Sequence, residues 1–289
     1  MAWPSGKAEA CKASIPQFES GCHLLLLLML YLVATPVGNL GDFSFRACEL
    51  LKSVDYLLCE DTRHSHILLK HYGISKPLKS YHRFKEAKVE EEVVGDLKKG
   101  LTIALLSDAG TPGIADPGHR LVCRCLEEGI PCSALPGPCS PILALTLSGF
   151  EPTPFQFIGF LPRSEGQLRS ALSQVLFYPG TTLCFESPNR IQKTLSLLVS
   201  MDKTRKLAIC RELTKIHEEI LIGTAETLGK EKLLGELVLV ISGNRGPDFS
   251  ALSPKEHVAQ LQVDYGLSKQ EAIKIAASLR QVPKKEIYF

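Results

Sequence analysis

The sequence predicts an α/β protein with two sheets and a small helical unit at its C-terminus. Before residue 149, short and continuously apolar segments alternate with amphipathic helical patterns four times, which is typical of a parallel sheet covered on both faces. Beyond residue 150 the apolar segments come closer together, and Lys215 alone separates two of them. That spacing predicts an antiparallel hairpin, and therefore a mixed sheet in the second half.

These changes of pattern divide the chain into four parts. Residues 29–149 are expected to form the parallel-sheet domain and residues 150–246 the mixed-sheet domain, with the Pro-containing segment 151–154 as the linker. Residues 247–289 are expected to form a helical tail. Residues 1–28 are interpreted as an extension that is either disordered or an artefact of an upstream start.

The apolar run at residues 24–34 supports this interpretation of the N-terminus. It is too short to span a bilayer, which needs ~20 apolar residues. A signal peptide would require a small-residue cleavage site, and none follows the run. We therefore expect Met29 to be the start of the working protein.

In the first half, each predicted strand leads into a helix with its own boundary signals. Asp42 is a suitable N-cap for the first helix, and Ser140 with Pro141 is a suitable start for the last. Several helices are followed by a glycine, which is common just past a helix C-terminus. The predicted strands are 30–34, 55–60, 101–107 and 131–135, and the helices between them cover 47–54, 63–72, 89–97 and 117–128.

The second half contains five further apolar segments and then two helix-start patterns. Ser253 with Glu256, and Ser268 with Glu271, form two successive capping boxes, which predict two short helices. These helices are expected to end in a basic tip at Lys284. The predicted strands are 155–160, 181–186, 206–213, 216–223 and 236–242, with helices between the first three.

Composition narrows the functional classes. The 289 residues are 45% hydrophobic, which excludes global disorder, and the net charge is +2, so a nucleic-acid partner would need a local basic patch. The ten cysteines form no Cys-x-x-Cys pair, and we interpret them as reduced core thiols of a cytosolic protein. His64 and His66 fall on different faces of a helix, so no metal site is expected.

Three loops rich in Gly and Pro, at 35–42, 108–118 and 136–141, follow predicted strands. In open α/β sheets, ligands bind at the carboxyl ends of the strands. The first loop lacks the spacing of a dinucleotide-binding glycine motif. In the second loop, Asp108 could accept hydrogen bonds from a hydroxyl, an amine or a ribose. The alternative is that Asp108 and Asp116 merely cap the loop and the following helix.

An ordered set of motifs resembles one family. From about Met29 to the C-terminus, the chain is similar to the ribosomal RNA small subunit methyltransferase I branch of the tetrapyrrole-methylase-like enzymes. The motifs that carry this resemblance are 31–40, 60–63, 107–118, 136–140, 159–162, 186–188, 211–215 and 235–236.

This resemblance implies a two-domain methyltransferase that holds S-adenosylmethionine in the cleft between its domains. It implies a cytoplasmic homodimer, with no membrane association, that methylates the ribose 2′-oxygen of a cytidine in 16S rRNA at the decoding centre of the small ribosomal subunit. Asp108 would be the polar anchor of the cofactor, and the second domain would contribute near Glu186 and Gly243. The implied cofactor contacts are Pro36, Gly38, Asp108, Ala109, Gly110, Thr111, Ala115, Ser140 and Pro141.

A ribose hydroxyl is a poor nucleophile, so a general base or a charge network would assist the reaction. The candidates are Glu60, Asp61, Glu186, Glu212 and Lys215. If the strand continues through residues 60–61, only one of the two is expected to face the crevice, because neighbouring strand residues point to opposite faces. The alternative for either is an ion pair with Arg63 or a helix cap.

Four arginines are candidates for contacts with RNA phosphates. The alternative is a surface salt bridge for Arg63 and Arg211 and a solvated side chain for Arg190. The loop 82–85 adds positive charge and a stacking ring, although an ordinary exposed loop fits it as well. The four arginines are Arg63, Arg83, Arg190 and Arg211.

Two other functions stay open. One is a methyltransferase of the same fold that acts on a precorrin-type tetrapyrrole, although the turn at 34–38 departs from the glycine-rich first turn of that branch. The other is a non-catalytic ribosome-binding protein that merely retains the fold. Neither the general base nor the dimer surface follows from the sequence.

Overall fold

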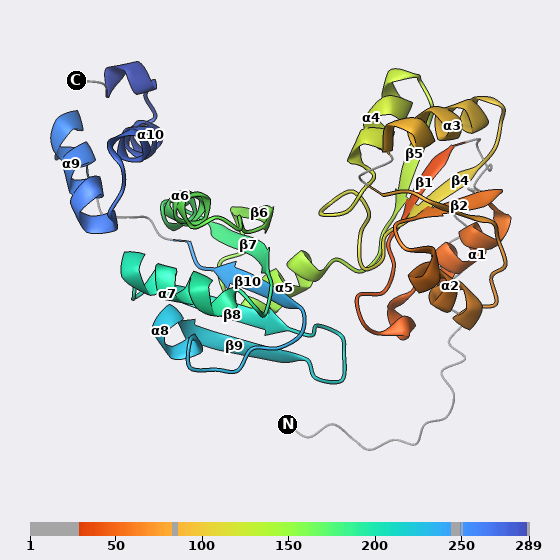
Figure 1. Cartoon of the computed structure of the whole chain (residues 1–289), viewed down its shortest axis with the longest axis horizontal. Helices are drawn as coiled ribbons and strands as arrows, with labels where there is room; N and C mark the ends of the chain where they lie inside the picture. The colour runs from red at the N-terminus through yellow and green to blue at the C-terminus, as the bar shows by residue number, and fades with distance from the viewer. Residues whose placement is uncertain (1–28, 83–85, 244–248, 250, 288–289) are drawn as a thin grey trace, which may run out of the picture.

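The computed structural model describes residues 29–82, 86–243, 249 and 251–287, and in these residues it contains two five-stranded sheets (Figure 1). The expectations for residues 1–28 lie outside the described residues. The first sheet is parallel throughout, as predicted, with strand order β3-β2-β4-β1-β5. Its strands are β1 (Leu30–Val33), β2 (Tyr56–Cys59), β3 (Leu78–Ser80), β4 (Ile103–Leu106) and β5 (Cys132–Leu135).

Helices cover both faces of this first sheet. Because successive strand residues point to opposite faces, Tyr31 and Val33 pack on one side with α1 and α2, whereas Leu30 packs on the other with α3 and α4. The short edge strand β3 was not predicted, because a three-residue strand with Lys79 at its centre carries no apolar pattern. The elements are η1 (Leu40–Asp42), α1 (Phe45–Ser53), α2 (Thr62–His71), α3 (Glu86–Lys98) and α4 (His119–Glu127).

The second sheet is mixed, as predicted. Its order is β6-β7-β10-β8-β9, with β6 and β7 parallel and the remaining pairs antiparallel. The predicted hairpin is present, but its second strand begins at Glu219 rather than at Ile216. The strands are β6 (Phe155–Phe160), β7 (Thr181–Glu186), β8 (Lys206–Arg211), β9 (Glu219–Thr224) and β10 (Leu237–Ile241).

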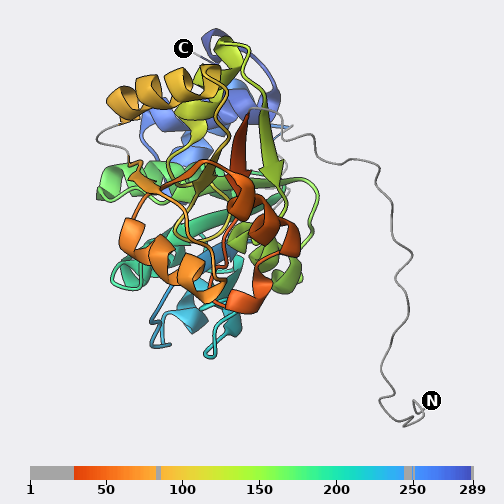
Figure 2. The same ribbon diagram turned by 90° about the vertical axis from the view of Figure 1, so that its right-hand side faces the viewer.

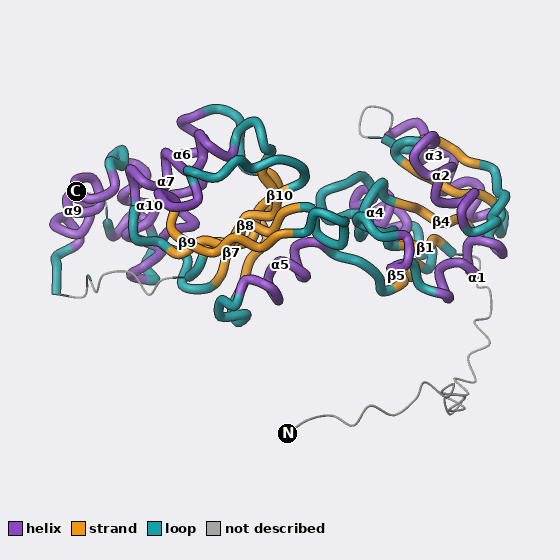
Figure 3. The backbone as a smooth tube through the Cα atoms, turned by 90° about the horizontal axis from the view of Figure 1, so that it is seen from below, coloured by secondary structure: helices purple, strands orange, loops and turns teal. Residues whose placement is uncertain are grey.

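Helix α5 (Ser140–Ser148) belongs to the second sheet, not to the first. It covers the face opposite α6 (Glu165–Leu176) and α7 (Ile191–Met201), as Figure 3 shows from below. Its Ala144 and Leu145 pack against Leu183 and Val240. The expected domain boundary at 149 therefore differs from the packing, in which the two cores divide before α5. The sequence could not show this, because α5 is apolar on nearly every side.

Several helix starts differ from their predicted positions by a few residues. Ser44, not Asp42, is the N-cap of α1, and its hydroxyl accepts a hydrogen bond from the Ala47 amide at 3.2 Å. Gly118, which has no side chain, is the N-cap of α4, so that helix begins at His119 rather than at the predicted Pro117. Cys139 is the N-cap of α5, which makes Ser140 its first helical residue.

The C-terminal tail forms a small helical unit with its own apolar core, built around Leu261 and Ala276. Both predicted capping boxes are present, at Ser253 and at Ser268. Tyr265 joins this unit to α6 by an edge contact with Phe177, at 4.7 Å between ring centroids. The helices after β9 are α8 (Ala225–Leu228), which was not predicted, α9 (Pro254–Tyr265), α10 (Lys269–Arg280) and η2 (Lys284–Glu286).

The two sheet domains lie one behind the other when the molecule is turned by 90° (Figure 2). All eight cysteines in the described part of the chain are free thiols. None of the helices in that part is both long and apolar enough to cross a membrane.

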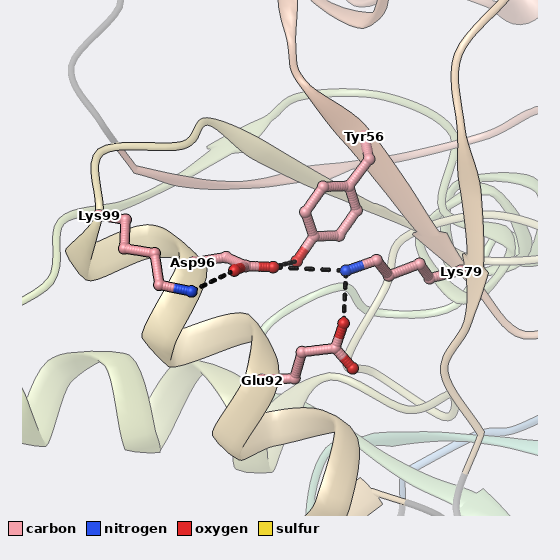
Figure 4. A network of polar contacts seen from close by, with 5 residues as sticks. All are labelled: Tyr56, Lys79, Glu92, Asp96 and Lys99. Carbon is pink, nitrogen blue, oxygen red and sulfur yellow. Dashed lines mark hydrogen bonds and ion pairs between the residues drawn. The ribbon is translucent and has the colours of Figure 1, made fainter.

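A polar network fastens the edge of the first sheet to α3 (Figure 4). The Tyr56 hydroxyl donates to Asp96 at 3.1 Å, and the Lys79 ammonium pairs with Glu92 at 2.7 Å and with Asp96 at 3.3 Å. The same ammonium lies 4.0 Å from the centroid of the Tyr56 ring. Burial and the neighbouring Asp96 carboxylate raise the pKa of Tyr56, which therefore stays protonated as a donor.

Replacing Tyr56 by phenylalanine should lower the free energy of unfolding by about 1 kcal/mol, because one partly buried hydrogen bond is lost while the ring under Lys79 remains. Urea unfolding followed by circular dichroism measures this change. As a control, Lys52→Ala breaks an exposed pair with Glu49 and should cost at most ~0.5 kcal/mol. Equal costs for both variants would contradict the role given to the network.

Candidate active site

The three Gly/Pro-rich loops meet at one edge of the first sheet, as predicted, because they follow the neighbouring strands β4, β1 and β5. The backbones of Thr35 and Gly110 exchange two hydrogen bonds, at 2.9 and 3.0 Å. The Thr111 hydroxyl donates to the Pro138 carbonyl at 2.9 Å, and the Ser107 hydroxyl donates to the Gly110 carbonyl at 2.8 Å. These bonds join the loops into one wall.

A cavity of 440 Å³ lies between this wall and the second sheet. The register pairs Leu237 with Glu186, so the start of β10 and the end of β7 both open toward the cavity. Residues from the first domain, from the start of α5 and from the second domain line this cavity. They are Val37, Glu60, 108–111 and 114–116 from the first domain, 139–141 at the start of α5, and Phe160, 185–188, Cys210, Leu213 and 235–238 from the second domain.

A second cavity of 250 Å³ adjoins the first. It lies on the side of α2 and is lined there by His64 and Ile67, whereas Lys215 lines it from the second domain. The two cavities share four lining residues, which form their common wall, so ligands in the two cavities would lie next to each other. The residues that line both are Val37, Asp108, Ala109 and Glu236.

A charged cluster from the second domain stands at this common wall. The Lys215 ammonium lies 2.9 Å from the Glu212 carboxylate and 3.0 Å from that of Glu236. Burial lowers the pKa of Lys215, but the hydrogen bonds to the two carboxylates outweigh it and leave that pKa above its usual value. The Glu236 amide and Lys215 hold the pKa of Glu212 below its usual value. Lys215 is therefore an ammonium at neutral pH.

Comparison with known proteins shows which family has this arrangement. Residues 29–229 match the family described as Tetrapyrrole (Corrin/Porphyrin) Methylases. The chain belongs to the tetrapyrrole methylase family. It is 42% identical over 269 residues to ribosomal RNA small subunit methyltransferase I of Halalkalibacterium halodurans, covering 90% of this chain and 93% of that one. The corresponding protein of Bacillus subtilis is 39% identical over 271 residues, covering 90% and 92%.

Solved structures agree on the fold of this methylase. Uroporphyrin-III-C-methyltransferase from Thermus thermophilus aligns with a TM-score of 0.52 at 19% identity, covering 74% of this chain and 93% of that one. Diphthine synthase aligns with a TM-score of 0.57 at 14% identity, covering 74% and 89%. The methylase is accordingly an S-adenosylmethionine-dependent methyltransferase.

The larger cavity of the methylase suits this cofactor. Its volume lies within the range of ~300–1,000 Å³ that is usual for small-molecule sites. Glu60, Asp108 and Asp116 line it, and carboxylates complement a cationic ligand. Gly110, at φ +80°, adopts a conformation that side chains disfavour and presents bare backbone there. When bound, S-adenosylmethionine supplies an electrophilic methyl group on a positively charged sulfur.

The cofactor contacts that the family resemblance implies do not all line the same cavity. Pro36 and Gly38 line the smaller cavity. Gly243 packs against the backbones of Pro179 and Gly180, at the end of β10 that lies away from the cleft, so the expected contribution near Gly243 is wrong. The implied contacts that line the larger cavity are Asp108, Ala109, Gly110, Thr111, Ala115, Ser140 and Pro141.

The catalytic candidates likewise do not all line the same cavity. Glu60 lines the larger cavity and Lys215 the smaller. Asp61 is the N-cap of α2 and also accepts from the Arg63 guanidinium at 2.8 Å. These side-chain and backbone hydrogen bonds from Arg63 lower the pKa of Asp61 to about 2. One residue of the 60–61 pair thus lines the cavity, although β2 ends at Cys59 and the strand alternation behind this expectation does not reach the pair.

Glu186 also lines the larger cavity, but its carboxylate is buried among protein partners. It accepts from the Ser187 amide and from the Thr194 hydroxyl, both at 2.7 Å, and lies 3.5 Å from the Arg190 guanidinium. These contacts fix the loop between β7 and α7. The geometry therefore favours a positioning role for Glu186.

The arginine candidates differ in how strongly other protein groups bind their side chains. Arg190 donates to the Leu161 and Pro162 carbonyls at 3.0 and 2.6 Å, and Arg211 pairs with Glu219. The alternative of a salt bridge fits Arg211, whereas Arg190 is bound to two carbonyls rather than solvated. The Arg63 side chain pairs with Asp61 yet is 90% exposed. Arg83 lies outside the described residues.

Residues that the sequence did not single out also line the cavities. Ile114 and Phe160 line the larger cavity, Ile67 lines the smaller, and Glu236 lines both. The Gly235-Glu236 pair before β10 was a signal for Glu236. Ile114 and Phe160 lie in the motifs 107–118 and 159–162, although neither was named as a contact. For Ile67 no sequence signal existed, because exposed isoleucines on helices are common. In the described part of the chain, no group of three or more His, Cys, Asp or Glu side chains could hold a metal ion.

Proposed function

We propose that this methylase transfers the methyl group of S-adenosylmethionine to the ribose 2′-oxygen of a cytidine in 16S rRNA, at the decoding centre of the small ribosomal subunit. The observation that carries the proposal is the likeness to proteins named ribosomal RNA small subunit methyltransferase I, at 42% and 39% identity over nine-tenths of the chain. The adjoining cavities support it, since methyl transfer brings donor carbon and acceptor oxygen to ~3–3.5 Å.

The charges at the cleft suggest how the ribose hydroxyl is activated. Asp61, with a pKa of about 2, is too weak a base, and Lys215 is already protonated. Glu60 lines the larger cavity next to the wall of 108–111, and we assign it the role of proton acceptor. The Lys215 ammonium would stabilise negative charge that develops on the acceptor oxygen.

Methylation of purified small subunits tests the proposal. Subunits from a strain that lacks the modification would be incubated with S-adenosylmethionine that carries a labelled methyl group. The label should appear in a dinucleotide that resists alkaline hydrolysis, because a 2′-O-methyl group blocks cleavage, and nucleoside analysis should give 2′-O-methylcytidine. Label on a base, or on another nucleoside, would contradict the proposal.

Two further measurements test the alternatives. Methylation of a precorrin-type tetrapyrrole, with no label on RNA, would favour a small-molecule methyltransferase of this fold. Absence of cofactor binding in calorimetry would favour a non-catalytic ribosome-binding protein. The turn at 34–38 argues against the tetrapyrrole.

A cytoplasmic homodimer is part of the proposal. Exposed apolar side chains lie on α5 at Ile142 and Leu147 and on β6 at Phe155 and Ile158, and such groups are typical of interaction surfaces. Light scattering coupled to size exclusion should give twice the mass of the chain. A monomer at micromolar concentration would exclude the dimer without affecting the proposed reaction.

A further inference from the structure

The loop between β4 and α4 lines the cofactor cavity with two stretches, 108–111 and 114–116. Hydrogen bonds to the loops after β1 and β5 hold the first stretch. The second stretch also lines a third cavity, of 380 Å³, which residues 113–120 border. Because residues 114–116 lie beside two open spaces, their position depends on how the C-terminal end of the loop is held.

A close backbone contact and an ion pair hold that end of the loop. Gly118 has a φ of +138°, and a Cβ atom there would lie 2.7 Å from the Leu105 Cδ2, so only glycine lets the backbone lie this close to β4. Two residues later, in the first turn of α4, the Arg120 guanidinium donates to the Glu90 carboxylate at 3.2 Å. Arg120 is therefore the side chain that connects the end of the loop to α3.

The Glu90 carboxylate is itself fixed by the core of the first domain. Glu90 is only 7% exposed, and its second oxygen accepts from the Tyr81 hydroxyl at 3.1 Å. Tyr81 is fully buried, and its amide donates to the Cys59 carbonyl at 2.8 Å. A buried carboxylate is tolerated when it is paired and hydrogen-bonded, and each oxygen of Glu90 has a partner. A continuous chain of contacts thus joins the end of β2, where Glu60 lines the cofactor cavity, to the first turn of α4.

A second arginine on α4 has a different arrangement. Arg124 lies 2.7 Å from Glu128 and 3.7 Å from Glu127, both at the C-terminal end of the same helix. Its side chain is 42% exposed and that of Arg120 is 58% exposed. The two arginines therefore share a helix and a similar exposure, but the pair with Glu90 is the one next to the cofactor loop.

We infer that Arg120 is a positioning residue for the cofactor. Its ion pair with Glu90 holds the start of α4, and with it residues 114–116, where they complete the wall of the larger cavity. Without the pair, the loop would spend part of its time in other positions. The apparent affinity for a ligand falls in proportion to the population of the binding-competent position, so S-adenosylmethionine would bind more weakly. This role holds for any methyl acceptor.

The two arginines provide a matched test. Arg120→Ala should raise the dissociation constant for S-adenosylmethionine by about 5- to 10-fold, which corresponds to a competent population of about a tenth to a fifth. Arg124→Ala should leave that constant within two-fold of wild type. Arg120→Lys keeps a cation that can reach the Glu90 carboxylate, so it should recover most of the affinity. Calorimetry on the purified full-length protein measures all three, and the melting temperature of each cofactor-free variant shows whether it is folded.

A double-mutant cycle shows whether Arg120 acts through Glu90. Glu90→Gln removes the charge but keeps an oxygen that can accept from the Tyr81 hydroxyl, and it should also weaken cofactor binding. In the Glu90→Gln background, Arg120→Ala should change the dissociation constant by less than two-fold, because groups that act as a pair are not additive.

Three results would overturn the positioning role. They are unchanged affinity in a folded Arg120→Ala, an equal loss in Arg124→Ala, and the same factor for Arg120→Ala in both backgrounds of the cycle. All three are read from cofactor binding. Failure of the protein to methylate small subunits would therefore contradict the proposed function and leave the role of Arg120 intact.

Discussion

Replacing Asp108 by alanine is expected to weaken the binding of S-adenosylmethionine by about 10- to 100-fold. Asp108 lines both cavities at the common wall, and its carboxylate accepts from the Asp61 amide at 3.2 Å. That bond aims the side chain from the end of β4 toward the end of β2. A hydrogen bond to a charged group contributes ~1.5–3 kcal/mol, which corresponds to the expected loss of affinity. Isothermal titration calorimetry measures it directly.

Two variants make the Asp108 result specific. Asp108→Asn keeps an acceptor oxygen but removes the charge, so its affinity should fall between those of wild type and Asp108→Ala. Asp42→Ala removes an exposed carboxylate at the end of η1 and should leave the affinity unchanged. If Asp108→Ala binds the cofactor within two-fold of wild type while its melting temperature is preserved, Asp108 is not the polar anchor.

The sequence predicted those features that depend on local pattern. Buried strands such as 103–106 are continuous apolar runs, and the capping boxes at Ser253 and Ser268 define helix starts whose hydrogen bonds the structure contains. The meeting of the three loops also followed, because the carboxyl ends of neighbouring parallel strands share one edge. Each of these conclusions required only the residues of the element itself and the rule that neighbouring parallel strands end at the same edge of the sheet.

Features that depend on how the domains close could not be predicted in this way. The pattern of α5 gives no side to bury, so its place on the second sheet is decided by the strands that it meets. Gly38 was expected on the cofactor side, yet the loop with Lys215, from the other domain, places it on the rim of the smaller cavity. The commitment of Arg190 to two carbonyls likewise depends on the loop after β6. A charged residue in the sequence indicates that its side chain will have a polar partner, but the tertiary structure decides which group that partner is.

The helical tail should lose stability as the pH falls below 6.5. His257 is fully buried, its ring stacks on Phe249 with 4.1 Å between centroids, and its Nδ1 accepts from the Arg280 Nε at 3.0 Å. Burial, and secondarily the Arg280 charge, lower the pKa of His257 to about 4. The unfolded chain, with a pKa of ~6.5, therefore binds a proton that the folded tail rejects, and the unfolding free energy should drop by ~2 kcal/mol between pH 8 and pH 5.

A variant that cannot titrate isolates this effect. In His257→Gln the amide oxygen can still accept from Arg280, so the variant should be less stable by a constant amount and lose no additional stability between pH 8 and pH 5 from this position. Hydrogen exchange of the α9 and α10 amides, compared between the two proteins at the same pH, cancels the intrinsic dependence of exchange on pH. The protection of wild type relative to the variant should therefore shrink as the pH falls, because only in the wild type does the unfolded chain bind a proton at position 257 that the folded tail does not. A constant difference across this range would mean that protonation of His257 does not oppose folding of the tail.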